Sequence, residues 1–320
     1  MNVVKPEMFI KAKEGKLNGL CEQLVMFVVF YIVITIMQSV PLFIYMFLKG
    51  IFIGIQNQTI SVDELNNMLY AIQDSRIYIY ILLFSNIIPI ALTIAFCKFV
   101  EKRSIESMGF IKKNILKNYI IGAIIGFFMI SAVIILNLLT GSAKFDSLYH
   151  INGLETIKFI IIYLIAFLIQ GASEEIILRG YFMTSLGAKH NTLIAILISS
   201  IIFALLHIAN ASVGWIAIIN ITLMGIFLSL YIICFDNIWG ACAIHSIWNF
   251  AQGNIYGLEV SGLNIKDSIF SIKTIQERTL INGGSFGPEG GIGVSIILIL
   301  SILILLMYMK KNNKIVTKIN

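Results

Sequence analysis

The sequence has few charged residues and few residues that break helices. Only 12% of its 320 residues are Asp, Glu, Lys or Arg, 58% are hydrophobic, and four are prolines. This composition excludes a soluble domain and a disordered chain, and it is typical of a polytopic membrane protein. The net charge of +6 comes from lysines clustered beside apolar runs. That distribution indicates contact with anionic lipid and argues against a nucleic-acid partner.

Several catalytic and redox signatures are also absent. Four cysteines without paired spacing argue against a disulfide framework and a CxxC metal motif (Cys21, Cys97, Cys234 and Cys242). No HExxH segment occurs, which excludes a zincin helix.

Long apolar runs are the main feature that the sequence does have. A spanning helix needs about 20 apolar residues, and eight runs are candidates, of which the fifth and seventh are short and carry polar residues. We therefore predict an all-α polytopic membrane protein with about eight transmembrane helices. The expected spans are Leu24–Leu48, Tyr78–Phe99, Tyr119–Leu139, Ile157–Leu178, Leu193–His207, Trp215–Cys234, Ile238–Phe250 and Ile292–Met309.

The distribution of Lys and Arg predicts the orientation. Both tails and the loop after the second run are rich in lysine, whereas the stretch from Ile51 to Ser75 has no Lys or Arg. By the positive-inside rule, both termini are expected in the cytoplasm. The first run exceeds a signal-peptide core and lacks a small-residue cleavage site, so we expect it to be retained.

The chain divides into three expected regions. They are an N-terminal membrane region (1–117), a catalytic core (118–254), and an outer loop with the last span and a basic tail (255–320). The composition, rich in Ile, Asn and Lys, is typical of AT-rich bacterial genomes. We expect a multi-pass protein of a bacterial cell membrane.

A cluster of charge interrupts the fourth apolar run. Glu174, Glu175 and Arg179 follow an almost wholly aliphatic segment, and each charge near the bilayer centre costs about 2.5–3.5 kcal/mol on insertion scales. Glu175 and Arg179 are spaced as a helical ion pair, which alone could join two helices. Glu174 points elsewhere on the helix, about 140° from Arg179, so a structural ion pair leaves it unexplained.

Two histidines and an asparagine lie on later helices. His207 ends the fifth run; if the chain turns at His190–Asn191, an antiparallel hairpin brings Glu174 level with His207. His245 and Asn249 share one face of the seventh helix. His245 is only about 12 Å from its cytoplasmic turn, so the first hairpin must extend further or tilt for the groups to meet. Each side chain alone also fits a polar packing role.

This set of residues allows two hydrolytic sites. In one, Glu174 and His207 activate a water that attacks a peptide carbonyl, and His245 and Asn249 stabilise the oxyanion. In the other, Glu174, His207 and His245 ligate zinc or another divalent metal that activates the water. These residue types fit a site with a metal cofactor and a site without one equally well.

The three motifs together resemble a known family. Glu174-Glu175-x-x-x-Arg179, Phe203-x-x-x-His207 and His245-x-x-x-Asn249 are similar to the motifs of the CAAX protease and bacteriocin-processing (CPBP) intramembrane proteases, which include the type II CAAX prenyl endopeptidases. The resemblance covers roughly residues 118–254. It implies an eight-helix endopeptidase whose site opens towards the cytoplasm. It also implies Glu174 as catalytic base with His207 as its partner, support from Glu175 and Arg179, and oxyanion stabilisation by His245 and Asn249.

Other function classes remain open at this point. A non-catalytic membrane scaffold or a bacteriocin-immunity protein would keep the fold without using Glu174. A transporter would also carry buried ionisable residues, but the halves of the sequence show no inverted symmetry of the kind many transporters have. The expected partners are a peptide or protein substrate at the membrane and the lipid bilayer; the sequence does not specify the substrate, its cleavage site or the oligomeric state.

Overall fold

The computed structural model describes residues 2–3, 5–56, 61–148 and 154–316, and it is mostly helical. Six helices in this part of the chain are long and apolar enough to cross a bilayer, which indicates a multi-pass membrane protein. They are Leu20–Ile55, Arg76–Val100, Ile115–Leu139, Glu155–Lys189, Trp215–Phe235 and Ile292–Lys311.

The expected count of eight spans is not confirmed. All eight expected segments are helical, but two of them, α9 (Thr192–Leu205) and α11 (Trp239–Phe250), are too short to qualify as spans. Both hold polar groups among apolar ones, and α11 is buried along almost its whole length. A short helix can carry such groups here because neighbouring helices, not lipid, surround it.

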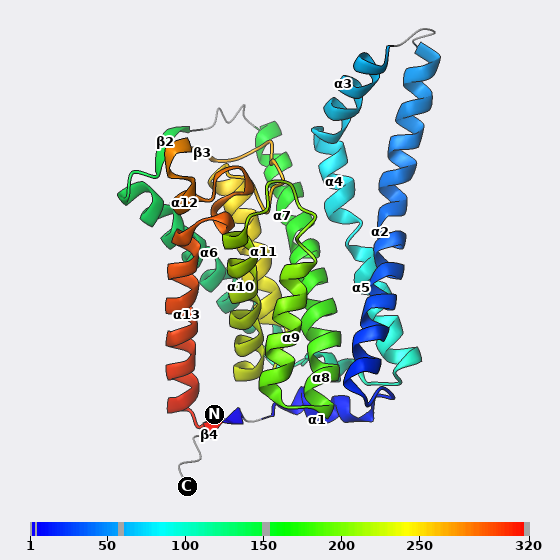
Figure 1. The fold of residues 1–320 in the computed structure, drawn as a ribbon, viewed down its shortest axis with the longest axis vertical. Helices are drawn as coiled ribbons and strands as arrows, with labels where there is room; N and C mark the ends of the chain where they lie inside the picture. Colours follow the sequence, from blue (N-terminus) through cyan, green and yellow to red (C-terminus); the bar gives the residue numbers. More distant parts are fainter. Residues whose placement is uncertain (1, 4, 57–60, 149–153, 317–320) are drawn as a thin grey trace.

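The other helices follow the order in Figure 1. The α-helices are α1 (Glu7–Lys11), α2 (Leu20–Gln56), α3 (Val62–Gln73), α4 (Arg76–Phe84), α5 (Ile87–Ala95), α6 (Ile115–Leu139), α7 (Leu154–Glu175), α8 (Thr184–Lys189), α10 (Trp215–Phe235), α12 (Thr279–Asn282) and α13 (Ile292–Lys311). Wider π-helical turns are η2 (Phe96–Val100), η4 (Ile176–Met183) and η5 (Ala251–Ile255). Short 3₁₀ turns are η1 (Ala12–Glu14), η3 (Ile105–Met108), η6 (Gln276–Arg278), η7 (Gly284–Phe286) and η8 (Pro288–Gly290).

Two small antiparallel sheets lie at opposite ends of the bundle. β1 (Asn2–Val3) pairs with β4 (Ile315–Val316), so the two ends of the chain meet (Figure 1). β2 (Ala143–Leu148) pairs with β3 (Phe270–Thr274) at the other end, beside the loop that leads into α13. Both termini therefore lie on one side, as expected, and the assignment of that side to the cytoplasm stays a prediction.

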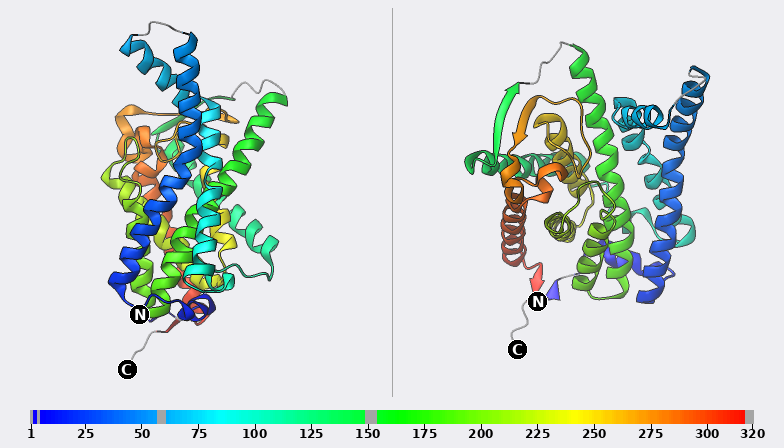
Figure 2. Two further views of the ribbon diagram at one scale, coloured as in Figure 1. Left: turned by 90° about the vertical axis from the view of Figure 1, so that its right-hand side faces the viewer. Right: turned by 45° about the horizontal axis from the view of Figure 1, so that its top comes forward.

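The helix that carries the charge cluster runs without a break through α7, η4 and α8. It ends at Lys189, and Asn191 caps the next helix by accepting from the backbone N–H of Leu193 at 2.8 Å. The predicted turn at His190–Asn191 is thus confirmed. The two arms of this hairpin lie side by side in both views of Figure 2.

Three glycines set the position of α11 in the bundle. A Cβ added to Gly122 or Gly126 of α6 would lie 2.2 Å from the carbonyl oxygen of Gly240 or 2.4 Å from that of Ile244. A Cβ on Gly171 of α7 would meet Ser246 at 2.6 Å. Only glycine permits such close backbone approach, so α6 and α7 hold α11 between them and fix where its side chains point.

Candidate active site

Glu175 and Arg179 form a fully buried ion pair. Arg179 Nη1 donates to Glu175 Oε1 at 2.9 Å, and neither side chain is exposed. The guanidinium also lies 4.4 Å from the ring centroid of Phe203 on α9, a cation–π contact. The pair has the spacing expected from the sequence, and it directs Arg179 towards Glu175, leaving Glu174 to meet other groups.

The same carboxylate orients His245 of α11. Glu175 Oε1 lies 2.8 Å from His245 Nδ1. Because an ionised carboxylate only accepts hydrogen bonds, Nδ1 carries a proton and donates it to Glu175. The Nε2 atom of His245 is then free to face the opposite direction, towards Glu174.

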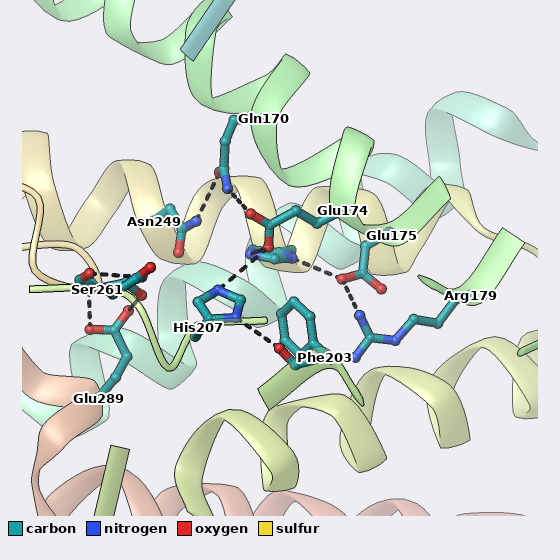
Figure 3. Close-up of polar contacts among 11 residues, drawn as sticks. Gln170, Glu174, Glu175, Arg179, Phe203, His207, Asn249, Ser261 and Glu289 are labelled. Carbon is teal, nitrogen blue, oxygen red and sulfur yellow. Dashed lines mark hydrogen bonds and ion pairs between the residues drawn. The ribbon is translucent and has the colours of Figure 1, made fainter. Parts of the chain in front are cut away.

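Glu174 Oε2 faces the Nε2 atoms of both histidines (Figure 3). The distances are 3.6 Å to His245 and 4.0 Å to His207. The Nδ1 atom of His207 lies 2.8 Å from the carbonyl oxygen of Phe203, which can only accept, so this Nδ1 also donates. Glu174 Oε2 is buried and has no hydrogen-bond partner in the protein. Three groups that can accept a proton thus converge on a space suited to a water molecule.

A chain of two carboxamides holds the other oxygen of Glu174. Gln170 Nε2 donates to Glu174 Oε1 at 2.6 Å, and Asn249 Nδ2 donates to Gln170 Oε1 at 3.0 Å (Figure 3). Gln170 lies one helical turn before Glu174 on α7. Asn249 therefore reaches the glutamate through Gln170, and its amide keeps a second N–H for another acceptor.

A cavity of about 610 Å³ opens from these side chains. This volume is in the range of small-molecule and peptide sites. Its lining combines polar and apolar side chains. The polar lining includes Gln38, Asn86, Gln170, Glu174, His207, Asn210, His245 and Asn249, and the apolar lining includes Tyr78, Leu82, Leu83, Phe167, Val260 and Leu263. The arrangement can hold a peptide with an apolar side chain beside the bond that faces Glu174.

A second carboxylate lies behind the histidines. A cavity of about 40 Å³ is bordered by His207, His245, Ser261 and Glu289, large enough for a water or two. Glu289 is almost fully buried; its carboxylate accepts from Gln252 Nε2 at 2.5 Å and from Ser261 Oγ at 3.2 Å. Burial raises the pKa of the Glu289 carboxyl above its usual value.

The donor atoms of Glu174, His207 and His245 are those of a zinc site. Each imidazole is also held at its other nitrogen by an acceptor, as metal-ligating histidines commonly are. Over residues 2–3, 5–56, 61–148 and 154–316, however, no three His, Cys, Asp or Glu side chains are grouped so that they could hold a metal ion. The metal alternative stays a prediction, and we derive no catalytic step from it.

The structure brings all six residues singled out in the sequence into one connected group. It adds residues that the sequence reasoning did not identify, namely Gln170, Asn210, Ser261 and Glu289. Gln170 had a usable signal, since it is a polar residue one turn before Glu174 in an apolar run. Asn210 and Ser261 lie in loops and Glu289 lies in the short turn η8, where no periodic pattern marks them.

Comparison with known proteins identifies part of the chain. Residues 156–251 match the family described as "Type II CAAX prenyl endopeptidase Rce1-like". No curated protein and no solved structure matches the chain. The matched segment holds Gln170, Glu174, His207, His245 and Asn249, which meet at the cavity. Over residues 156–251 the chain therefore carries a domain of the Rce1-like type II CAAX prenyl endopeptidase family.

Proposed function

We propose that this protein is an intramembrane endopeptidase that hydrolyses peptide bonds of a membrane-associated peptide or protein. One observation supports this most strongly: Glu174 Oε2, with no partner in the protein, faces two imidazole nitrogens at the edge of a cavity of about 610 Å³. A structural ion pair does not need that arrangement. Membership of a protease family points to the same chemistry.

The proposed reaction begins with a water between Glu174 and His207. Glu174 takes a proton from this water, and the hydroxide oxygen bonds to the carbonyl carbon of the scissile peptide. The carbonyl π electrons move onto oxygen to give a tetrahedral oxyanion. When the intermediate collapses, the C–N bond breaks and the leaving nitrogen takes the proton from Glu174. His207 holds the water and the proton in line.

The proposed oxyanion donors are His245 and Asn249. His245 uses its Nδ1–H for Glu175, so it must carry a second proton on Nε2 to donate to the oxyanion. The local charges suit that form, because two carboxylates and one guanidinium leave one negative charge that a protonated His245 balances. Asn249 contributes the N–H that Gln170 does not use. Fixed donors of this kind commonly supply the largest electrostatic term.

Glu174→Gln tests the proposal because it keeps the shape of the side chain and removes the base. Cells that express the protein should contain new peptide N-termini, and these should fall by roughly 100-fold or more in the variant. Protein abundance in the membrane should be unchanged. Glu277→Ala, an exposed carboxylate on η6, is the matched control and should leave the cleavage products at their original level.

The same experiment separates the alternatives. If new N-termini persist in Glu174→Gln, Glu174 is not the base and the proposal is wrong. A scaffold or immunity protein would show no cleavage products in either form and would keep its cellular effect in the variant. Elemental analysis of the purified protein, with activity measured after chelator treatment, distinguishes the metal-dependent mechanism from the metal-free one.

A further inference from the structure

Exposed positive charge gathers at one end of the molecule, here called the basic end. It is the end where β1 pairs with β4 and where α8 turns into α9 (Figure 1). The basic side chains there are Lys98, Lys102, Lys112, Lys113, Lys310 and Lys311. The opposite end mixes both signs, as in the ion pair of Lys273 with Asp146 at 2.9 Å. By the positive-inside rule the basic end is cytoplasmic.

Packed aromatic rings lie between the basic end and Glu174. Phe27 of α2 stacks on Phe182 of η4 with centroids 4.0 Å apart. Phe30 contacts Phe96 at 4.4 Å and Tyr181 at 5.5 Å. Phe27, Phe30, Tyr181 and Phe182 are all buried. Tyr181 and Phe182 come two helical turns after Glu174, on the basic side of it, so this aromatic layer fills the space between α2, η2 and η4 on that side.

A buried polar layer lies next to the aromatic rings, on the side of the basic end. Arg103, which follows η2, is almost fully buried, and its Nη2 donates to Thr184 Oγ1 at 2.7 Å. Its Nε donates to Ser107 Oγ at 3.2 Å. The guanidinium thus ties the loop after η2 to the hairpin. A polypeptide entering from the basic end would have to break both layers.

The cavity is open on the other side. Ala209 and Ala211, in the loop between α9 and α10, and the turn Val260–Leu263 in the loop after α11 form its rim. Both loops lie at the ends of their helices that face away from the basic end (Figure 1). Ala209 and Ala211 are exposed at the surface of the protein.

Contacts from three segments hold the turn Val260–Leu263 in place. Asn210 Nδ2 donates to the carbonyl oxygen of Ser261 at 3.1 Å. The backbone N–H of Gly262 donates to the carbonyl oxygen of Phe286 at 2.8 Å. Glu289 accepts from Ser261 Oγ. Gly262 has φ +86°, and a Cβ there would lie 2.4 Å from the carbonyl oxygen of Ala211. The turn is therefore a fixed rim that keeps the mouth in one shape.

We propose that the active-site cavity is entered from the end opposite the basic end, so that its substrate is a peptide segment at the non-cytoplasmic face of the membrane. The occupant of the cavity is called a substrate on the basis of the proposed function, whereas the side of access is argued separately. It differs from the cytoplasmic opening that the family resemblance implies. The aromatic layer and the position of the rim indicate the end at which the cavity opens, and the lysines indicate on which side of the membrane that end lies.

Cysteine labelling tests the side of access directly. Ala209→Cys is made in a Cys21→Ser, Glu174→Gln background, and Ala211→Cys is made in parallel in case one variant folds poorly. Spheroplasts that carry the protein in the cytoplasmic membrane are treated with a charged, membrane-impermeant maleimide, before and after permeabilisation. Native Cys21, which is exposed at the start of α2 at the basic end, is the control in the otherwise unchanged chain. Cys97, Cys234 and Cys242 are buried.

The two ends of the molecule should label under different conditions. The thiols introduced at positions 209 and 211 should react fully in intact spheroplasts, because both positions are exposed at the rim of the mouth. Permeabilisation should therefore add nothing to their labelling. Native Cys21 should stay at background in intact spheroplasts and react only once the membrane is opened.

Three results would overturn the proposal. The introduced thiols at positions 209 and 211 could react only after permeabilisation, they could fail to react in either condition, or Cys21 could react in intact spheroplasts. None of these readings depends on catalysis, because every variant at the rim carries Glu174→Gln. A failure of the proposed protease function would appear in the cleavage experiment, and a failure of the proposed side of access would appear in the labelling experiment.

Discussion

Two spans with similar apolar composition have opposite surroundings. In the most apolar 18-residue window of Leu20–Ile55 only 17% of residues are buried, whereas 67% are buried in that of Trp215–Phe235. The first runs along the outside of the bundle as α2, and the second, α10, lies inside it (Figure 2). Hydropathy identifies both as spans. Only the packing shows that one faces lipid and the other supports the site.

One polar side chain from each helix illustrates the same contrast. On α2, Ser39 Oγ donates to the carbonyl oxygen of Ile36 within its own helix, at 2.7 Å. On α10, Asn220 Nδ2 donates at 2.8 Å to the carbonyl oxygens of Glu289 and Gly291, and so holds the segment that carries the second carboxylate. Asn220 therefore joins distant parts of the chain, whereas Ser39 is satisfied within its own helix.

The largest contrast is expected from removing a buried charge. Glu175→Gln removes the negative charge that pairs with Arg179 and leaves His245 a neutral, weaker acceptor, and breaking a buried ion pair costs about 3–5 kcal/mol. We expect a large drop in the thermal unfolding temperature in detergent and loss of cleavage. Ser39→Ala on α2 is the control and should change neither. A Glu175→Gln protein as stable and active as the original would contradict the comparison.

A smaller contrast is expected from two glycines. Gly126→Ala places a Cβ 2.4 Å from the carbonyl oxygen of Ile244, whereas the same change at Gly54 of α2 meets nothing within 4 Å. Overpacking costs about 1–3 kcal/mol, and a shift of α11 would also move His245. Thermal unfolding and cleavage should both fall for Gly126→Ala and stay unchanged for Gly54→Ala. Equal effects of the two substitutions would show that α11 is not held as described.

The smallest effect is expected from Glu289 and depends on pH. Its folded-state pKa is raised by burial, so the folded protein binds more protons than the unfolded chain above the usual carboxyl pKa. The free energy of unfolding should therefore fall as pH rises through the raised pKa. His207 and His245 border the same small cavity, so the readout is the difference between the original protein and Glu289→Gln. A difference that does not change with pH would contradict the raised pKa.

Much of the site could be predicted because polar residues stand out in apolar runs. Glu174, His207 and His245 interrupt segments that otherwise fit lipid, and counting from the turn at His190–Asn191 placed Glu174 level with His207. The depth of His245 could not be predicted, because it depends on glycine contacts between α6 and α11. Ser261 lies in an irregular loop and Glu289 in the short turn η8, and the positions of both follow from tertiary contacts that leave no periodic signal.

The count of eight spans is not confirmed for a related reason. A sequence window treats α11 as a short span, but its surroundings are protein on nearly every side. The polar residues that shorten its apolar run are the ones that meet Glu175 and Gln170. The features that make this segment a poor membrane span are therefore those that make it part of the site.

The most direct test of the central claim, that Glu174 and His207 act as one hydrolytic unit, is a double-mutant cycle. The cleavage rate is measured for the original protein, Glu174→Gln, His207→Ala and the double variant. Groups that act together lose their effect together, so the double variant should be no slower than the slower single variant. Losses that multiply in the double variant would show that the two residues act independently and would contradict the account.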